Sequence, residues 1–290
     1  MENNWAYQWK MSFNPDISKQ AHEVVFSRKN IKISHPPLTF NNIPVAQVDS
    51  QKHLGISLDK KLNFDGHLGN SQSKVNRIIG IIRKLQNVLP RSALLTIYKS
   101  FARPHLDYGD VIYDKAYNES FKSKLESIQY NAALAITGAI KGSSTEKIYS
   151  ELGLESLGMR RWYRKLSFLF KIIKNESSPY LFNLLPNNPR QQITRNSNNF
   201  PIFRINHEYF KSTFFPSAIL EWNKLDSFIR NSETFSLFKK RILDFIKQNP
   251  NHIFNIYNPV GVKYLTRLRI GFSHLKEHKF RHNFQDCKIQ

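Results

Sequence analysis

The stretch VNRIIGIIRKL, residues 75–85, decides the fold class of the middle of this chain. Its apolar side chains recur at the three-and-four spacing of one helix face: Val75, Ile78, Ile79, Ile82 and Leu85. The positions flanking this apolar stripe are basic: Lys74, Arg77, Arg83 and Lys84. The pattern predicts a long amphipathic helix that begins after Phe64 and ends before Pro90.

Similar periodicity predicts further helices downstream, at residues 92–103, 121–139, 157–174, 218–225, 235–246 and 260–284. The last of these is strongly basic, with Lys263, Arg267, Arg269, Lys276, Lys279 and Arg281. Prolines and asparagines accumulate in residues 177–200, which predicts an irregular linker there.

Upstream of the first long helix the pattern indicates short strands, at residues 23–27, 38–40, 45–48 and 53–58. Asn41-Asn42 is a turn signal between two of them. We therefore predict an α+β protein, with a small antiparallel sheet or hairpin followed by mainly helical structure. The predicted divisions are residues 1–65, a helical region 66–176, the linker, and a basic helical region 201–290.

The charge balance of the chain indicates a polyanionic partner. Its 290 residues carry 43 Lys and Arg against 22 Asp and Glu, a formal net charge of +21. Such an excess is typical of proteins that bind nucleic acid, although a merely basic soluble protein also fits. With 40% apolar and 13% aromatic residues, the chain has enough apolar side chains to build a core.

Cysteine usage and hydropathy exclude several classes of protein. The single cysteine, Cys287, allows neither an internal disulfide nor a CxxC-type zinc site. No apolar run reaches the roughly 18 residues of a membrane span, and the first residues are too polar for a signal peptide. We expect a protein of the cytoplasm or nucleus with no membrane partner.

A series of short strings, in order along the chain, carries a family resemblance. The first lie near the N-terminus: Trp9-Lys10-Met11-Ser12-Phe13-Asn14 with Lys19 and Val24-Val25-Phe26, then His53-Leu54-Gly55-Ile56 with Leu58-Asp59 and Leu62-Asn63-Phe64. The others follow downstream: YKSFARPHLDY from Tyr98 to Tyr108, Arg161-Trp162-Tyr163-Arg164-Lys165, Glu221-Trp222-Asn223-Lys224-Leu225, and Leu268-Arg269-Ile270-Gly271 with His274-Leu275. Together they resemble the region C-terminal to the catalytic palm in Jockey-like non-LTR (LINE-type) retrotransposon reverse transcriptases, which are RNA-directed DNA polymerases.

The resemblance implies specific roles. His53, Leu54, Gly55 and Ile56 are similar to the primer-grip hairpin, and residues 98–108 to the thumb that follows it. The family's palm aspartates bind two metal ions, with Mg as cofactor, and their motifs would lie upstream of Met1, so we expect no metal or other cofactor here. The family's terminal Cys/His knuckle also has no counterpart at Cys287, so we expect a truncated element that does not polymerise alone.

Two other clusters of side chains could be considered as metal sites. Asp107, Asp110 and Asp114 surround a Tyr108-Gly109-Asp110-Val111 string, but Val111 stands where a paired aspartate would be. We interpret Asp107 and Asp110 as capping and turn residues, not as ligands for two metal ions. His274, His278 and His282 repeat every fourth residue, yet a third histidine lies too far along a helix for a closed tetrahedral site; positions near phosphate or solvent fit them better.

The tryptophans and basic residues complete the predicted site. Trp9, Trp162 and Trp222 fit either core packing or base stacking, and their helical spacing favours core. We predict phosphate contacts with an RNA/DNA hybrid or nucleic-acid duplex at Lys74, Arg77, Arg83, Lys84, Arg91, Lys99, Arg103, Arg160, Arg161, Arg164 and Lys165. The missing polymerase palm is a second possible partner. The alternative is an inert transposon remnant or a host-expressed protein-interaction module without a nucleic-acid role.

Overall fold

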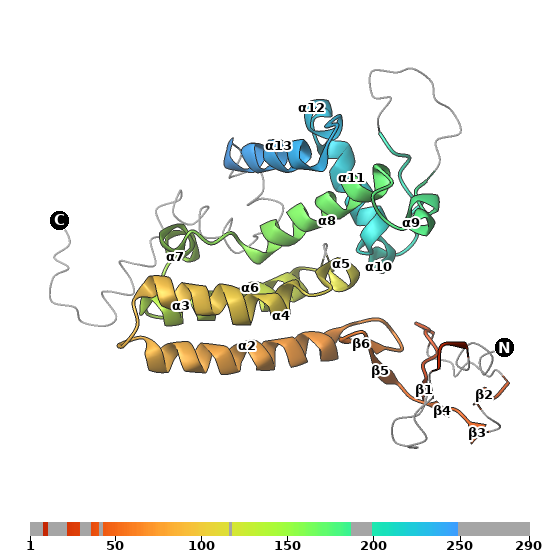
Figure 1. Ribbon diagram of the computed structural model, residues 1–290, viewed down its shortest axis with the longest axis horizontal. Coiled ribbons are helices and arrows are strands. Elements are labelled where there is room, and N and C mark those ends of the chain that lie inside the picture. Colours follow the sequence, from red (N-terminus) through yellow and green to blue (C-terminus); the bar gives the residue numbers. More distant parts are fainter. Residues whose placement is uncertain are drawn as a thin grey trace. The chain divides into compact units, whose positions relative to one another are not determined.

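The computed structural model describes residues 8–10, 22–29, 36–40, 43–115, 118–186 and 199–248. The chain forms two compact units, Met1–Ser73 and Lys74–Gln290. Figure 1 shows short strands in the first unit and helices in the second. The predicted α+β class, a small strand region followed by mainly helical structure, is confirmed. The division into four regions stays a prediction.

The strands that the structure describes form three separate pairs in the first unit. β1 (His22–Glu23) lies parallel to β4 (Ala46–Gln47). Two other pairs are antiparallel: β2 (Thr39–Phe40) with β3 (Ile43–Pro44), and β5 (Ser50–His53) with β6 (Ile56–Asp59). Phe40 is the register partner of Ile43, and the turn predicted at Asn41-Asn42 lies outside the described residues.

Two strand predictions need correction. Residues 53–58 are not one strand, because the chain reverses at Leu54 and Gly55, which have φ values of 45° and 85°. Positive φ at both positions of a two-residue turn matches the twist of a hairpin, and Gly55 adopts it without steric cost. The strand predicted at residues 23–27 is only His22–Glu23.

The carboxylate of Asp59 organises the connection from β6 to the first long helix. It accepts hydrogen bonds from the backbone N–H groups of Lys61 at 3.0 Å, Asn63 at 3.0 Å and Phe64 at 2.7 Å. Burial acts to raise the pKa of Asp59, but these backbone donors outweigh it and hold the pKa below its ordinary value. The loop is therefore held by an ionised side chain where α2 (Asp65–Leu85) begins.

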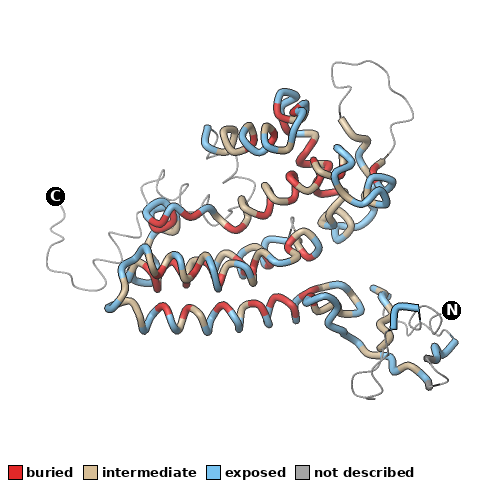
Figure 2. Tube along the Cα trace, viewed as in Figure 1, coloured by how far each residue is buried: buried red, intermediate tan, exposed pale blue. Residues whose placement is uncertain are grey.

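α2 confirms the helix predicted from residues 75–85, and it passes from the first unit into the second. Asp65 occupies its first turn, and Arg83 and Lys84 its last, which places each charge where the helix dipole favours it. Val75, Ile79 and Ile82 are buried, as the apolar stripe requires. Figure 2 shows buried positions recurring along one side of this helix.

The helix predicted at residues 92–103 is a continuous helical run in three parts: α3 (Arg91–Ile97), the π-helical turn η2 (Tyr98–Ala102) and α4 (Arg103–Asp107). Four more predicted helices are confirmed: α6 (Glu119–Thr137), α8 (Leu157–Ile173), α11 (Phe214–Lys224) and α13 (Phe235–Gln248). The sequence analysis missed shorter helices: α5 (Asp110–Tyr113), α7 (Thr145–Leu152), α9 (Pro179–Asn183), α10 (Glu208–Lys211) and α12 (Ser227–Arg230). One of these, α9, lies inside the predicted irregular linker.

α8 is the central helix of the second unit. It packs against α5 and α6 through one part of its surface and against α9, α11 and α13 through another. In the second contact, the ring of Phe170 stacks on that of Phe238 at 4.4 Å between centroids, and Trp222 stacks on Phe238 at 5.7 Å. Burying a side chain of this size stabilises the fold by roughly 1.5–3 kcal/mol. α8 is thus held rigidly, with its polar face toward α4 and α5.

Candidate nucleic-acid interface

The C-terminal part of α2 presents a row of exposed cations. Lys74, Arg77 and Lys84 are exposed and lie within about 80° of arc around a helix with 3.6 residues per turn. Arg83 is also exposed and lies on the other flank of the buried stripe. From Lys74 to Lys84 the helix rises about 15 Å, which spans several phosphates of a strand with a 3.4 Å repeat.

These four side chains are not neutralised within the protein. In the part of the chain that the structure describes, none of Lys74, Arg77, Arg83 and Lys84 has a carboxylate or hydrogen-bond partner. Lys74 does act on its neighbourhood. Burial and the charge of Lys74 lower the pKa of His105 on α4, which leaves that imidazole neutral at pH 7. An unpaired cation row on a rigid helix can attract an anionic partner at little cost in desolvation.

Three further predicted cations lie on the run from α3 to α4. Arg91 is engaged within the protein, because it pairs with Glu151 and donates to the Thr137 carbonyl at 3.2 Å. Lys99, in the π-helical turn, is half-buried and has no ion-pair partner among the described residues. Arg103 is half-buried, with its Nε 3.8 Å from Asp107. Lys99 thus resembles the α2 cations in having no ion-pair partner among the described residues, whereas Arg91 is paired.

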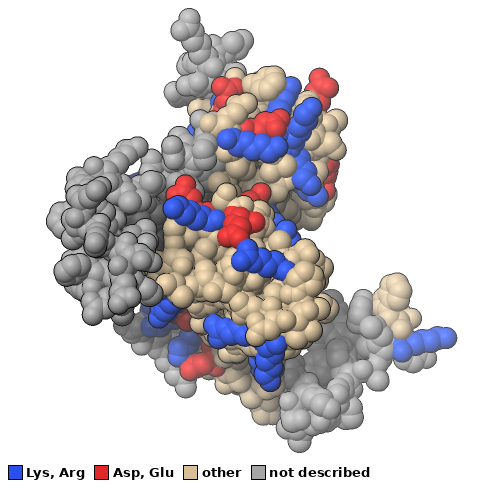
Figure 3. All heavy atoms as spheres, turned by 90° about the vertical axis from the view of Figure 1, so that its left-hand side faces the viewer, with Lys and Arg blue, Asp and Glu red and all other residues tan. Residues whose placement is uncertain are grey.

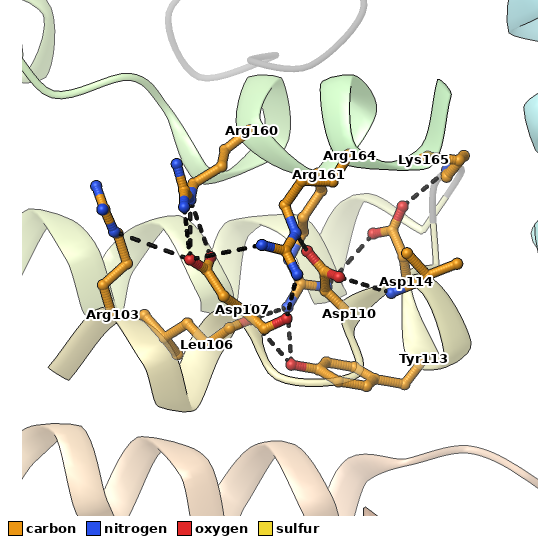
Figure 4. Close-up of polar contacts among 11 residues, drawn as sticks. Arg103, Leu106, Asp107, Asp110, Tyr113, Asp114, Arg160, Arg161, Arg164 and Lys165 are labelled. Carbon is orange, nitrogen blue, oxygen red and sulfur yellow. Dashed lines mark hydrogen bonds and ion pairs between the residues drawn. The ribbon is translucent and has the colours of Figure 1, made fainter. Parts of the chain in front are cut away.

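The four predicted cations of α8 face a group of aspartates instead of solvent. Figure 4 shows Arg160, Arg161, Arg164 and Lys165 descending from α8 toward Asp107, Asp110 and Asp114 on and beside α4 and α5. Arg160 contacts Asp107 through Nε at 3.0 Å and Nη2 at 2.8 Å. Arg164 lies 2.7 Å from Asp110, and Lys165 lies 2.8 Å from Asp114. We call these seven side chains the acid–base layer.

The inner members of the acid–base layer are buried. The side chains of Arg161 and Lys165 are 3% and 2% exposed. Arg161 also donates to the Leu106 carbonyl at 2.8 Å and to the Tyr113 hydroxyl at 3.0 Å. Burial acts to raise the pKa of Asp114, but Lys165 and Arg161 outweigh it and hold that pKa below its ordinary value. These two cations cannot reach a phosphate without leaving the core, which corrects their assignment as surface contacts.

The aspartates therefore have a role that the sequence analysis did not predict. Asp110 accepts from the Val111 N–H at 2.9 Å where α5 begins, in line with a turn residue, but it also binds Arg164. Burial raises the pKa of Asp110, and Arg161 and Arg164 offset this only in part. Each carboxylate has its own cation partner on α8, so the three do not converge as ligands of a metal pair. The described residues contain no group of His, Cys, Asp or Glu arranged to hold a metal ion.

The primer-grip-like residues form the turn of the β5–β6 hairpin. Leu54 is 79% exposed at its tip, whereas Ile56 is 6% exposed and packs inward. His53 and Gly55 are exposed. Behind the hairpin, the Ser57 N–H donates to Nδ1 of the buried His67 on α2 at 3.4 Å. The hairpin thus presents one apolar side chain to solvent on a firmly held turn.

The predicted core role of the tryptophans is confirmed at two of three positions. Trp162 and Trp222 are each 3% exposed, and the Trp162 indole N–H donates to Glu221 at 3.2 Å. Trp9, in contrast, is 67% exposed. The basic helix predicted at residues 260–284, its histidines and Cys287 lie outside the described residues. No described helix is long and apolar enough to cross a membrane.

Figure 3 shows how Lys and Arg are distributed on one face of the molecule. Basic side chains occur in several places on the described surface, with Asp and Glu among them. The net charge alone therefore does not locate an interface. The presence or absence of an ion-pair partner is more informative. Of the eleven predicted cations, those on α2 and Lys99 have no such partner in the described structure, whereas those on α8 are paired.

Comparison with known proteins shows a similarity to the RNA-directed DNA polymerases of non-LTR retrotransposons, which confirms the predicted resemblance. The chain is 30% identical over 158 residues to the RNA-directed DNA polymerase from mobile element jockey of Drosophila melanogaster, covering 53% of this chain and 16% of that protein. It is 29% identical over 139 residues, 47% of this chain and 15% of the relative, to the probable RNA-directed DNA polymerase from transposon X-element of the same species.

A third relative, the probable RNA-directed DNA polymerase from transposon BS of Drosophila melanogaster, is 25% identical over 139 residues. The matched region spans about 15% of the length of each of these relatives. No protein-family model matches the chain. No solved structure matches it either.

Proposed function

We propose that this chain is the part of a non-LTR retrotransposon RNA-directed DNA polymerase that follows the catalytic palm, and that it binds a template–primer duplex. The similarity to three such polymerases supports the first part. The second part is carried by one observation. The exposed cations of α2 have no anionic partner in the described structure, whereas each of the four cations of α8 forms an ion pair with Asp107, Asp110 or Asp114.

In this account α2 lies along the sugar-phosphate backbone. Lys74, Arg77 and Lys84 are spaced along one face, so they can contact successive phosphates without reading sequence. An RNA/DNA hybrid would be recognised through its shape and its phosphates. The acid–base layer fixes α8 against α4 and α5 and so keeps the helical unit rigid. The chain positions nucleic acid and does not polymerise by itself.

The test compares the affinity of two triple variants for nucleic acid: one lacks three charges of α2, and the other lacks three charges elsewhere on the surface. The variant Lys74→Gln/Arg77→Gln/Lys84→Gln is titrated against a fluorescently labelled RNA/DNA hybrid by anisotropy. The control, Lys124→Gln/Lys239→Gln/Lys240→Gln, removes three exposed lysines from α6 and α13. We expect the α2 variant to bind at least tenfold more weakly than the control. Equal weakening by both variants would show that total charge, and not the α2 face, determines affinity.

A further inference from the structure

A polar cavity of about 150 Å³ lies beside the π-helical turn, within the second unit. It is lined by residues from four segments of the chain: Lys99, Arg103, Gln129, Gly153, Leu154, Glu155 and Arg160. One water molecule needs roughly 10–15 Å³ of such space, so the cavity has room for a larger polyatomic group. Three of its lining residues are cations, which makes an anion the natural occupant.

The three cations come from two helical segments, Lys99 and Arg103 from the run of η2 and α4 and Arg160 from α8, and they keep donors free. Figure 4 shows Arg103 rising from α4 and Arg160 descending from α8 on the same side of Asp107. Arg160 binds Asp107 through Nε and Nη2, and its Nη1 has no hydrogen bond in the described chain. Among the described residues, the one ion pair of Arg103 is the 3.8 Å contact with Asp107. Lys99 has no partner among the described residues.

The wall of the cavity is held in place by buried hydrogen bonds. Tyr98, fully buried in the π-helical turn, donates from its hydroxyl to Gln129 Oε1 at 2.8 Å. Gln129 Nε2 in turn donates to the Glu155 carbonyl at 2.8 Å. Gly153 has a φ of 57° and ends α7, which turns the chain toward α8. A π-helical turn within a longer helix often marks a functional site, and here it places Lys99 at the cavity.

We propose that this cavity is a phosphate-binding pocket, in which Lys99, Arg103 and Arg160 hold one phosphoryl group. The guanidinium of Arg103 can bind phosphate oxygens, Arg160 can add a donor through Nη1, and the ammonium of Lys99 adds a point charge, so the three together suit a tetrahedral anion. The exposed Glu155 opposes them and limits the affinity. The pocket's part in nucleic-acid binding rests on the function proposed above, but its affinity for a phosphoryl group does not.

The pocket is tested by calorimetric titration of the full chain with inorganic phosphate at constant ionic strength. Lys99→Gln should bind phosphate about tenfold more weakly, the value of one charge-assisted hydrogen bond. Glu155→Gln should bind it roughly threefold more tightly, because it removes a charge that opposes the anion. Lys124→Gln, which removes an exposed lysine outside the pocket, should match the parent protein. Identical affinities for Lys99→Gln and Lys124→Gln would overturn the proposal, as would the absence of phosphate binding by the parent protein.

Competition identifies the source of the phosphoryl group. An oligonucleotide with a 5′-phosphate and the same strand with a 5′-hydroxyl are each used to displace bound inorganic phosphate. Displacement by both supports the pocket as a site for a backbone phosphodiester, and displacement by the phosphorylated strand alone supports it as a site for a strand end. A chain that binds the RNA/DNA hybrid but shows no Lys99-dependent phosphate binding would refute the pocket and leave the proposed function standing.

Discussion

Arg160 on α8 and Asp107 at the end of α4 form a two-nitrogen ion pair, with Nε 3.0 Å from both carboxylate oxygens and Nη2 2.8 Å from one of them. The two residues are 53 positions apart in the sequence. Arg103 and Arg164 also reach Asp107, at 3.8 Å and 4.0 Å. One carboxylate therefore ties α8 to the helical run that carries Lys99.

Substitution of Asp107 should be destabilising. Asp107→Asn leaves three partly buried guanidinium groups without their common anion, and we expect the free energy of unfolding to fall by about 2 kcal/mol. Urea denaturation measures this change. The control Asp244→Asn removes an exposed carboxylate 3.9 Å from Lys247, which should change stability by less than about 0.5 kcal/mol. Equal effects of the two substitutions would mean that the acid–base layer does not hold the fold.

Glu126 should make stability depend on pH. Burial raises the pKa of this carboxyl, and the nearby Tyr149 hydroxyl and the hydrogen bond from the Leu157 N–H offset that only in part. A folded-state pKa above the unfolded value of about 4.3 favours the protonated folded form. The stability that protonated Glu126 contributes to the fold is fully present below a pH of about 4.3 and is lost as the pH rises through the folded-state pKa. Glu126→Gln should abolish this loss. We therefore expect the free energy of unfolding of the variant, relative to that of the parent, to be higher at pH 7 than at pH 4. A pH-independent difference between the two proteins would contradict the burial argument.

Two glycines should respond in opposite directions to alanine. Gly138 ends α6 with a φ of 73°, and an added Cβ would lie 2.5 Å from Gln86 Nε2, so Gly138→Ala should cost about 1–2 kcal/mol. Gly80 lies inside α2, and an added Cβ would meet nothing within 4 Å outside the helix's own backbone, so Gly80→Ala should stabilise by about 0.5–1 kcal/mol through helix propensity. Thermal unfolding of both variants checks the prediction. Stabilisation by Gly138→Ala would show that α6 does not end in the left-handed conformation.

The tip of the β5–β6 hairpin offers a test of the primer-grip resemblance. Leu54→Asn keeps the turn, since asparagine tolerates a positive φ better than leucine does. It removes the exposed apolar side chain, and we expect affinity for an RNA/DNA hybrid to fall about threefold, the loss of roughly 0.7 kcal/mol of apolar contact. Anisotropy measures the affinity, and circular dichroism confirms that the variant is folded. An unchanged affinity for the hybrid would show that the apolar tip of the hairpin does not contribute to binding.

Long helices could be predicted from the sequence because their signal is local. The apolar spacing from Val75 to Leu85 and from Leu157 to Ile173 is sufficient to identify α2 and α8. Short elements such as α5 and α7 were missed, because four to eight residues hold too little periodicity to separate a helix from a turn. The predicted strand at residues 53–58 was wrong because the positive φ values of Leu54 and Gly55 reverse the chain within it.

The candidate site was predictable only in part, because pairing between distant charges is not local. Lys74 and Arg161 look alike in the sequence, yet one is exposed and unpaired and the other is buried against Asp114 and Tyr113. One signal was present. Asp107, Asp110 and Asp114 follow a helical three-and-four spacing, as do Arg160, Arg161, Arg164 and Lys165, and complementary spacings of opposite charge favour two facing helices.

The salt dependence of binding tests the central claim most directly. The parent chain is titrated against a labelled RNA/DNA hybrid by anisotropy at a series of salt concentrations. If the unpaired cations of α2 and Lys99 neutralise about five phosphates, log affinity should fall against log salt with a slope of about −4.5. The triple α2 variant should show a slope shallower by about 2 to 3. A flat salt response of the parent chain would contradict the account, because binding would then not depend on phosphate contacts.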